Sequence, residues 1–548
     1  MRLKFTLHAL IILSIMTGCA KNYSENDIVP KKKDDTQDDI TPHYWAGNKK
    51  VVMEAQPEKS FIIFNGTDRY DIIDADKMDY SVFKTAKVPE GRMFRKGLTR
   101  AADIENATWA IGSTRAFNMA EDKILYKSQA YKNSKGTDIF ISHLFYVKLK
   151  SAADYPELQR MADENNIEIL GNVGEHLDLW YKLACSAESD CDALAMSARF
   201  YESGLFQYAE PDIMFEIRPC SKLPNSYPEY QAPTRVSDAS APNDPLFPQQ
   251  WHLHNPGGLD INYLEAKAIT QGSPDITVLV IDPFGVAHNH PDLPNNFSIY
   301  YDALNDIRHG TACVGIMSAQ TNNNIGIAGI APNCTYKFKQ LPMLYGIDQY
   351  SVICNTLLNG ALDNKADIIS CSWETYPEYN IEGIMMISDL FYQLHQGGRW
   401  HYDETKDLGC VVIFASGNCG QSQSSDIAGW ADLSVGAILK NGNIHPTSNG
   451  GSLVAPGQDI VTTYPMDDKY FTVPDETIEY WSNFDQTSAA CPQVAATAAL
   501  ILSLNPDLYH YEVANYITST AQPLSSSKTG AGLLNTGNAL KLVLKKDI

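Results

Sequence analysis

The sequence has few basic residues, and only Lys31–Lys33 form a block. Its 548 residues carry 43 Lys and Arg against 65 Asp and Glu, which gives a formal net charge of −22 at pH 7. Because nucleic acids are bound through clustered positive charge, this balance argues against a nucleic-acid partner. It favours an acidic, soluble protein that attracts cations such as calcium.

Cysteine is scarce, with 11 residues in the chain. A disulfide scaffold needs a much higher density, so the core is expected to rest on packing. Cys185 and Cys191 are close enough in sequence for a local bridge. Four other cysteines lie in apolar or small-residue runs and are expected to be buried free thiols: Cys313, Cys371, Cys410 and Cys491.

Long hydrophobic runs are also absent. The apolar stretch from Phe5 to Gly18 is too short to cross a bilayer, and it follows the basic residues Arg2 and Lys4. With Cys19 directly after it, the segment resembles a bacterial lipoprotein signal. That resemblance implies lipidation of Cys19 and export to a bacterial membrane, on the periplasmic or the cell-surface side. The alternative is a simple secretory peptide. No later segment is predicted to span a membrane.

The N-terminal half contains two patterns of secondary structure. Short β-type runs occupy residues 43–136, and one of them ends at the hairpin signal Asn65-Gly66. From 138 to 217, patterns typical of strands and helices follow the order β-α-β-β-α-β. A small α+β domain is expected there.

Prolines interrupt the sequence between 218 and 245, which favours an exposed boundary accessible to proteases. Beyond it, apolar runs at 275–282, 366–372 and 409–415 are typical of strands buried on both faces of a parallel sheet. Helical segments separate them, so a doubly wound α/β fold with a mostly parallel sheet is expected. The predicted organisation is a signal peptide (1–18), a flexible tether (19–42), a β-rich region of unknown role (43–136), a βαββαβ domain (137–219), a proline-rich linker (220–242) and the α/β domain (243–548).

Polar side chains follow the apolar runs of the predicted parallel sheet. Asp282 ends the first run, and Ser372 and Asn418 follow the next two, at the strand ends that line the functional crevice of such sheets. Ser488 and Pro492 begin an Ala-rich run. Both are expected in the first turn of a buried helix, where a developing negative charge is stabilised. Taken singly, each residue also has an ordinary structural explanation, such as a cap.

Four local sequences change that interpretation. They occur in the order VIDPFGVAHNHPDL, RHGTACVGIMSAQTNNNIGIAGIAP, VVIFASGN and QTSAACPQVAATAAL, and they contain Asp282, His309, Asn418 and Ser488. Together they resemble the subtilisin-like serine proteases, the subtilases, whose triad follows the order Asp, His, Ser. The resemblance covers residues 243–548.

The resemblance implies a serine endopeptidase acting on proteins or peptides. Four catalytic roles are implied: the nucleophile for Ser488, the general base for His309, the orientation of that base for Asp282, and an amide donor to the oxyanion for Asn418. Two segments are implied to contact the substrate: Ser372, Trp373 and Glu374, and Ser416 and Gly417.

In this family a loop similar to residues 321–327 wraps a calcium ion. The resemblance therefore implies a structural calcium site with oxygen ligands, which suit a hard cation. The implied ligands are Asp244, Asp292, Thr321, Asn323, Ile325 and Ile327. An asparagine-rich turn without metal is the alternative.

The βαββαβ domain resembles an inhibitory propeptide of subtilases, with residues 208–212 (YAEPD) as the stretch that lies near the active site. The resemblance implies a precursor in which the propeptide binds its own catalytic domain in cis until the linker is cut.

The sequence departs from the family pattern at three places. Pro283-Phe284 stand where one Thr or Ser is usual, and Gln486 and Glu374 replace glycines. The changes at 283 and 486 leave open a catalytically impaired relative that acts as a binding protein. Glu374 favours basic or extended polar substrates.

Two other hydrolase classes have less support. His288, His290 and His309 are close in sequence, but no His-Glu-x-x-His motif places two imidazoles on one helical face for a metal. The run 525–528 (SSSK) matches a Ser-Lys nucleophile pattern but is typical of a polar turn.

Overall fold

The computed structural model describes most of the chain from Thr41 onward. The signal peptide, Cys19 and most of the proline-rich linker lie outside the described residues. These residues are 41–65, 81–84, 107–114, 124–215, 217–220, 240–287, 289–294, 298–300, 307–341, 347–375, 384–399, 407–465 and 480–546.

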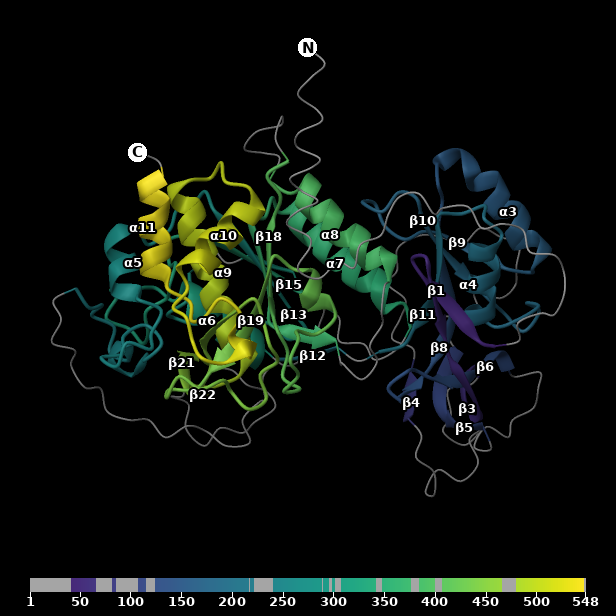
Figure 1. Cartoon of the computed structure of the whole chain (residues 1–548), viewed down its shortest axis with the longest axis horizontal. Helices are drawn as coiled ribbons and strands as arrows, with labels where there is room; N and C mark the ends of the chain where they lie inside the picture. Colours follow the sequence, from purple (N-terminus) through teal and green to yellow (C-terminus); the bar gives the residue numbers. More distant parts are fainter. Residues whose placement is uncertain are drawn as a thin grey trace, which may run out of the picture. The chain divides into compact units, whose positions relative to one another are not determined.

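Seven parallel strands form the central sheet (Figure 1). Both faces of the sheet are covered, so its central strands β18 and β19 are buried at every position, whereas β15 (TYKFKQ) is buried only at alternate residues. The expected doubly wound α/β fold is confirmed. In spatial order the strands are β14 (Ser298–Tyr300), β15 (Thr335–Gln340), β13 (Thr277–Asp282), β16 (Ile368–Cys371), β18 (Val411–Ala415), β19 (Leu433–Ile438) and β20 (Leu453–Pro456).

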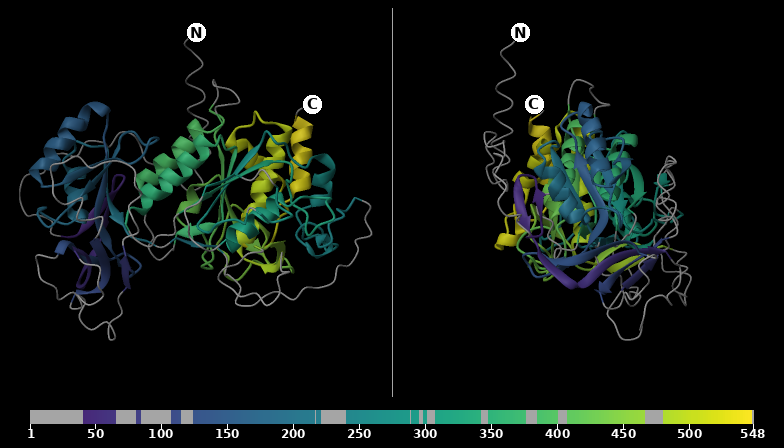
Figure 2. Two further views of the ribbon diagram at one scale, coloured as in Figure 1. Left: turned by 180° about the vertical axis from the view of Figure 1, so that it is seen from behind. Right: turned by 90° about the vertical axis from the view of Figure 1, so that its right-hand side faces the viewer.

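Helices cover both faces of this sheet, as the views in Figures 1 and 2 show. Successive residues of a strand point to opposite faces. Leu279 and Ile281 of β13 therefore belong to one apolar core, and Val278 and Val280 to another. The first core includes α7 (Gln349–Asp363) and α8 (Met385–Gly397); the second includes α6 (Arg308–Ser318) and α9 (Thr487–Leu504).

Helix α9 lies at the centre of the second core. By length and composition it is apolar enough to cross a membrane, but 89% of its apolar window is buried inside the protein. It is therefore a core helix. The other elements of this half are α5 (Tyr263–Ile269), β17 (Trp373–Thr375), β21 (Ile460–Thr463), β22 (Tyr480–Phe484), α10 (His510–Thr520) and α11 (Thr536–Lys546).

The N-terminal half contains two larger antiparallel sheets and a β1–β2 hairpin. The five-stranded sheet has the order β4-β5-β3-β6-β7, and the four-stranded sheet has the order β11-β8-β10-β9, with α4 packed on β8 and β11. The elements are β1 (His43–Ala46), β2 (Lys49–Val52), β3 (Glu54–Asn65), β4 (Ser81–Lys84), β5 (Ala107–Ser113), β6 (Ile124–Lys132), β7 (Asp138–Ile139), β8 (Ile141–Lys148), α3 (Tyr155–Glu164), β9 (Glu168–Asn172), β10 (Trp180–Ala184), α4 (Ala193–Glu202), β11 (Tyr208–Ile213) and β12 (Ile217–Pro219).

The two halves pack together through α7 and α8. The rings of Phe215 and Tyr350 have centroids 4.9 Å apart, and Trp180 Nε1 donates a hydrogen bond of 2.7 Å to Asp389 Oδ2. One apolar core runs from the N-terminal sheets into these two helices. Packing, not disulfides, joins the halves.

The ten cysteines among the described residues are all free thiols. No bridge joins Cys185 to Cys191. The four cysteines predicted to be buried thiols, Cys313, Cys371, Cys410 and Cys491, are buried.

Candidate functional site

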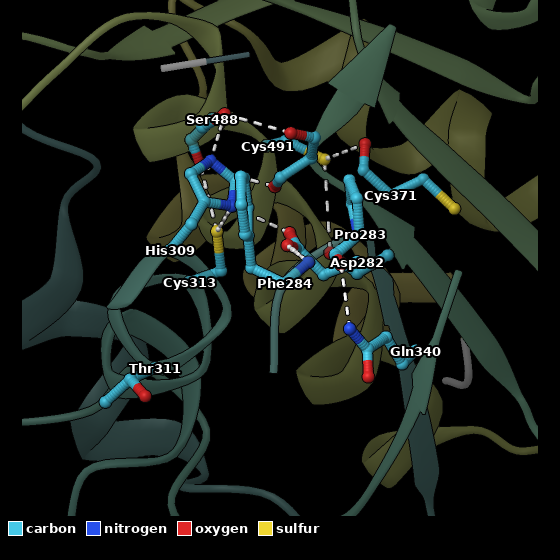
Figure 3. A network of polar contacts seen from close by, with 12 residues as sticks. Asp282, Pro283, Phe284, His309, Thr311, Cys313, Gln340, Cys371, Ser488 and Cys491 are labelled. Atoms are coloured by element: carbon cyan, nitrogen blue, oxygen red, sulfur yellow. Dashed lines mark hydrogen bonds and ion pairs between the residues drawn. The ribbon is translucent and has the colours of Figure 1, made fainter. Parts of the chain in front are cut away.

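Three polar side chains from different elements meet at the carboxyl end of β13 (Figure 3). Asp282 is the last residue of β13, His309 is the second residue of α6, and Ser488 is the second residue of α9. His309 Nδ1 lies 2.8 Å from Asp282 Oδ2, and His309 Nε2 lies 2.9 Å from Ser488 Oγ. The chain of contacts can carry a proton from the hydroxyl to the imidazole while the carboxylate holds the other ring nitrogen.

All three side chains are fully buried. Burial by itself lowers the pKa of the His309 imidazole, but the charges and hydrogen bonds of Asp282 and Cys313 together outweigh it and raise that pKa well above its usual range. Asp282 Oδ1 accepts a hydrogen bond of 3.0 Å from the backbone N–H of Phe284. The Pro283-Phe284 insertion therefore fixes the carboxylate and does not displace it.

The small residues after His309 let α6 lie close to the turn that follows β13. A Cβ atom on Gly310 would lie 2.5 Å from the carbonyl oxygen of Gly285, so only glycine lets α6 pass the turn after β13. Thr311 Oγ1 accepts a hydrogen bond of 2.8 Å from the backbone N–H of Ala287 and ties the two segments together.

Pro492 lies deeper in its helix than predicted. It is the sixth residue of α9, not part of the first turn, so its missing N–H leaves the carbonyl of Ser488 without its helical partner. That carbonyl instead accepts from Ser372 Oγ at 3.3 Å and from Cys313 Sγ at 3.8 Å. The proline thus frees the backbone around Ser488 to bind the neighbouring strand end.

Asn418 lies in the loop after β18, beside the start of α9. Its Oδ1 accepts hydrogen bonds from Thr487, at 3.0 Å from Oγ1 and 3.3 Å from the backbone N–H. This fixes the amide so that Nδ2 is the free donor. Asn449 braces the same loop: its Nδ2 donates to the carbonyl of Ser416 at 3.0 Å, and its Oδ1 accepts from the N–H of Cys419 at 3.0 Å.

Gln486 adopts a backbone conformation that favours glycine. Its φ is 71° and its ψ is −161°, a region that costs a side-chain-bearing residue on the order of 1–3 kcal/mol. Two bonds hold it there: its N–H donates to the carbonyl of Gly457 at 2.8 Å, and its Nε2 donates to Thr447 Oγ1 at 2.9 Å. Gln486 therefore fits at a position where the family has glycine, and Ser488 is not displaced.

The predicted substrate-contact residues border this group. Ser372 follows β16, Trp373 and Glu374 begin β17, and Ser416 and Gly417 follow β18. Trp373 is fully buried against Phe414, with ring centroids 5.0 Å apart.

Glu374 contacts the loop that carries Asn418. Its side chain is fully buried, and Oε2 accepts a hydrogen bond of 3.1 Å from the backbone N–H of Asn418. A Cβ on Gly417 would lie 2.3 Å from the same oxygen. The carboxylate therefore holds the Asn418 loop, and because β12 pairs with β17 across this position, the preference for basic or extended polar substrates stays a prediction.

The end of the N-terminal half occupies the strand edge beside Ser488. β12 pairs antiparallel with β17, and Cys220 continues it: the N–H of Cys220 donates to the carbonyl of Ser372 at 3.0 Å. The N–H of Ser488 donates to the carbonyl oxygen of Cys220, also at 3.0 Å. The carbonyl group of Cys220 thus binds the backbone of the residue whose hydroxyl contacts His309, and sequence analysis missed Cys220 because Pro219 and its neighbours were assigned to a boundary.

The predicted calcium ligands come together only in part. Asp292 Oδ1 accepts from Asn323 Nδ2 at 2.8 Å and Oδ2 from the N–H of Ile327 at 3.0 Å. Asp244 accepts from the N–H groups of Asn322 and Asn323 at 3.0 and 3.2 Å.

The backbone at 321–327 therefore faces the two carboxylates with N–H groups at Asn322, Asn323 and Ile327. The hydroxyl of Thr321 bonds the carbonyl of Gly329 at 3.2 Å, and the N–H of Ile325 bonds Asn323 Oδ1 at 2.8 Å. The donor set, two carboxylates and an amide oxygen, suits a hard cation, but hydrogen bonds hold these groups here.

Comparison with known proteins agrees with this geometry. The model of the subtilase family matches residues 273–536. The thermophilic serine proteinase of Bacillus sp. (strain AK1) is 30% identical over 330 residues, which cover 58% of this chain and 73% of that protein.

Furins are also similar. Furin of Mus musculus is 26% identical over 390 residues, covering 66% of this chain, and furin of Homo sapiens is 27% identical over 339 residues, covering 57%. The chain spans 45% and 40% of the length of these two relatives.

Among solved structures, fervidolysin from Fervidobacterium pennivorans, a keratinolytic enzyme related to subtilisin, is 18% identical with a TM-score of 0.55. The match covers 73% of this chain and 61% of that one. At this identity, the likeness shows the fold.

Proposed function

The chain belongs to the subtilase family, and from this premise we propose that it is a serine endopeptidase that hydrolyses peptide bonds in proteins or peptides. One observation carries the proposal: His309 contacts both Ser488 Oγ and Asp282 at hydrogen-bond distance. A serine hydroxyl is a weak nucleophile unless a base within such reach removes its proton.

In the proposed reaction Ser488 Oγ attacks the scissile carbonyl carbon and passes its proton to His309 Nε2. Asp282 stabilises the imidazolium that forms, and His309 then gives the proton to the leaving amine. Water enters the same cycle to release the acyl group, and the serine is regenerated.

The negative charge that develops on the carbonyl oxygen needs donors already in place. The backbone N–H of Ser488, at the start of α9, is one candidate, because it already binds a carbonyl oxygen, that of Cys220. Asn418 Nδ2 is the second, since Thr487 holds the opposite end of the amide.

We propose further that the chain is a precursor and that its first substrate is the peptide bond after Cys220. Three contacts support this: the pairing of β12 with β17, the N–H of Cys220 on Ser372, and the N–H of Ser488 on the Cys220 carbonyl. Main-chain bonds of this kind align an extended substrate strand. The new N-terminus would be Ser221.

Both proposals are tested on the purified full chain. A fluorophosphonate probe is expected to label Ser488, and N-terminal sequencing after incubation is expected to find a fragment that begins at Ser221. Absence of labelling would support the rival function, a binding protein built on an inactive peptidase fold. If Ser488 is labelled but the first cut lies elsewhere, the peptide bond after Cys220 is not the first substrate, and the proposed peptidase function still stands.

Two carboxylates of β11 support inhibition in cis by the N-terminal half. Glu210 accepts from the N–H of Met385 at 2.5 Å, at the start of α8, and Asp212 accepts from the N–H of Asp348 at 2.8 Å, just before α7. Both side chains are fully buried in this contact. Their oxygens thereby bind N–H groups at the starts of two helices, where the helix itself supplies no partner.

Docking of the cleaved N-terminal half is expected to weaken as the pH rises. Burial raises the pKa of Glu210 to about 8 and that of Asp212 to about 7. Free carboxyls titrate near pH 4, so the docked state binds more protons than the separated state. The affinity of the cleaved N-terminal half for the rest of the chain is therefore highest at low pH. As the pH rises, each of the two carboxyls lowers this affinity by up to about tenfold per pH unit, until the docked carboxyls ionise.

Size-exclusion chromatography of the cleaved chain measures this effect. We expect the two fragments to elute together at pH 5.5 and apart at pH 8.5. The matched variant, Glu210→Gln with Asp212→Asn, keeps one acceptor oxygen on each side chain but cannot ionise, and it is expected to lose the pH dependence. Separation of the wild-type fragments on acidification instead would contradict the prediction.

We also propose that the cluster of Asp244, Asp292 and Asn323 takes up calcium. Burial, assisted by the charge of Asp244, raises the pKa of Asp292 to about 6, and a bound cation would offset the repulsion between the two carboxylates. Calcium would be exchanged for the N–H donors that now hold Asp292. Titration calorimetry of the full chain is expected to give uptake that Asp292→Asn weakens at least about tenfold. No heat from calcium with the wild-type chain would refute the site.

A further inference from the structure

A second cluster of metal-binding side chains lies away from Ser488. It consists of His395 near the end of α8, Asp432 just before β19, and His510 at the start of α10. Asp432 precedes its strand and accepts from the N–H of Val412 at the beginning of β18, so the cluster lies at the amino edge of the sheet. Asp282 ends its strand at the carboxyl edge, and the two groups are therefore separate.

The three side chains converge on one carboxylate. His510 Nδ1 lies 2.6 Å from Asp432 Oδ1, and His395 Nε2 lies 3.3 Å from Asp432 Oδ2. All the candidate ligand atoms lie within 4.8 Å of one another. His395 Nε2 is a buried nitrogen, and beyond this ion pair with Asp432 it has no hydrogen-bond partner among the described residues.

We propose that His395, Asp432 and His510 bind one transition-metal ion of the zinc type. Two imidazole nitrogens and one carboxylate oxygen are the donors that Zn²⁺ prefers, whereas calcium takes oxygen ligands. Ligands at about 2.0–2.1 Å in tetrahedral directions lie roughly 3.3 Å apart. The two nitrogen–oxygen contacts here are 2.6 and 3.3 Å, and the candidate ligand atoms all lie within 4.8 Å of one another, so small side-chain movements would bring them to an ion. A water molecule would fill the fourth position.

The protein around the cluster is arranged to hold it. The N–H of Val412 donates to Asp432 Oδ2 at 2.8 Å, and the N–H of His510 donates to the carbonyl of Leu408 at 2.8 Å. Hydrogen bonds that hold the ligand residues in this way orient them toward a metal ion. Gly409 keeps the space open, because a Cβ there would lie 2.6 Å from the His510 ring.

The imidazole rings stack with centroids 4.1 Å apart and planes 8° from parallel. To direct both lone pairs at one ion, the rings have to open relative to each other. The side chains of His395 and His510 are 20% and 16% exposed, so this movement and the entry of an ion can occur from the solvent side. The bound ion would cross-link α8, β19 and α10.

Calorimetric titration of the metal-free full chain with Zn²⁺ tests the proposal. We expect one ion per chain. His395→Gln and His510→Gln are each expected to lower the affinity for Zn²⁺ by more than about 100-fold, because losing a metal ligand costs more than losing a hydrogen bond that orients a ligand. His176→Gln is the control, because His176 Nε2 is also buried without a hydrogen-bond partner but belongs to no such cluster.

A second measurement covers the case in which a variant fails to fold. Co²⁺ added to the wild-type chain is expected to give the visible absorption of a tetrahedral site with nitrogen and oxygen ligands, and Zn²⁺ is expected to displace it. Absence of Zn²⁺ uptake by the wild-type chain, or uptake unchanged in both ligand variants, would overturn the proposal. Neither result depends on peptidase activity.

Discussion

Replacing Ser488 by alanine is expected to lower kcat for peptide hydrolysis by about a million-fold, the loss that removal of this serine causes in subtilisin. Among the described residues, the Ser488 hydroxyl is the group within hydrogen-bond distance of His309 Nε2, so no other nucleophile is expected to take its place. The same substitution is expected to leave the bond after Cys220 uncut. Peptide turnover and electrophoresis of the full chain measure the two effects.

Ser525→Ala is the matched control. This exposed serine begins the 525–528 run that matches a Ser-Lys pattern, but Lys528 Nζ is engaged by the carbonyl of Gly420. Activity is expected to stay unchanged in this variant. A Ser488→Ala chain that kept more than a hundredth of the wild-type turnover would show that the assigned nucleophile is wrong.

Replacing Asp282 by asparagine is expected to lower kcat by about ten-thousand-fold with little change in KM. Asp282 Oδ2 faces His309 Nδ1, and the N–H of Phe284 holds Oδ1. The variant amide would present its NH₂ group to the imidazole. This favours the tautomer that carries its proton on Nε2, where the base has to be free. Steady-state kinetics with the active enzyme counted by probe labelling separates kcat from folding yield.

Two further variants give a lower and an intermediate effect for comparison with Asp282→Asn. Asp275→Asn changes an exposed carboxylate just before the same strand and is expected to be neutral. Asn418→Ala removes one oxyanion donor and is expected to cost about 100- to 1000-fold, less than Asp282→Asn. An Asp282→Asn enzyme within tenfold of wild type would mean that the carboxylate neither orients nor stabilises the histidine.

The part of the fold that sequence predicted best is the part with strong local signals. The apolar runs that end at Asp282, Ser372 and Asn418 can be buried only in a covered parallel sheet, and this fixes the fold class. His309 and Ser488 were identified through resemblance to a family. Sequence spacing alone does not show that helices 179 positions apart meet at a contact of 2.9 Å.

Other features depend on contacts that no local pattern predicts. β12 contains Pro219, and a proline usually argues against a strand, yet its missing N–H costs little at an edge. Glu374 was assigned by its charge, and no local pattern predicts that it also accepts a hydrogen bond from the N–H of Asn418. His395, Asp432 and His510 are distant in sequence and belong to no motif, so only the assembled sheet brings them together.

The unfavourable backbone of Gln486 has a consequence for how the enzyme tolerates change. Relaxation of this turn is opposed by one side-chain amide on Thr447 and one main-chain bond to Gly457. A substitution of Thr447 that removes its hydroxyl would allow the backbone of Gln486 to relax, and this would shift the first residues of α9. Mutational sensitivity should therefore extend from Ser488 to positions that never contact a substrate.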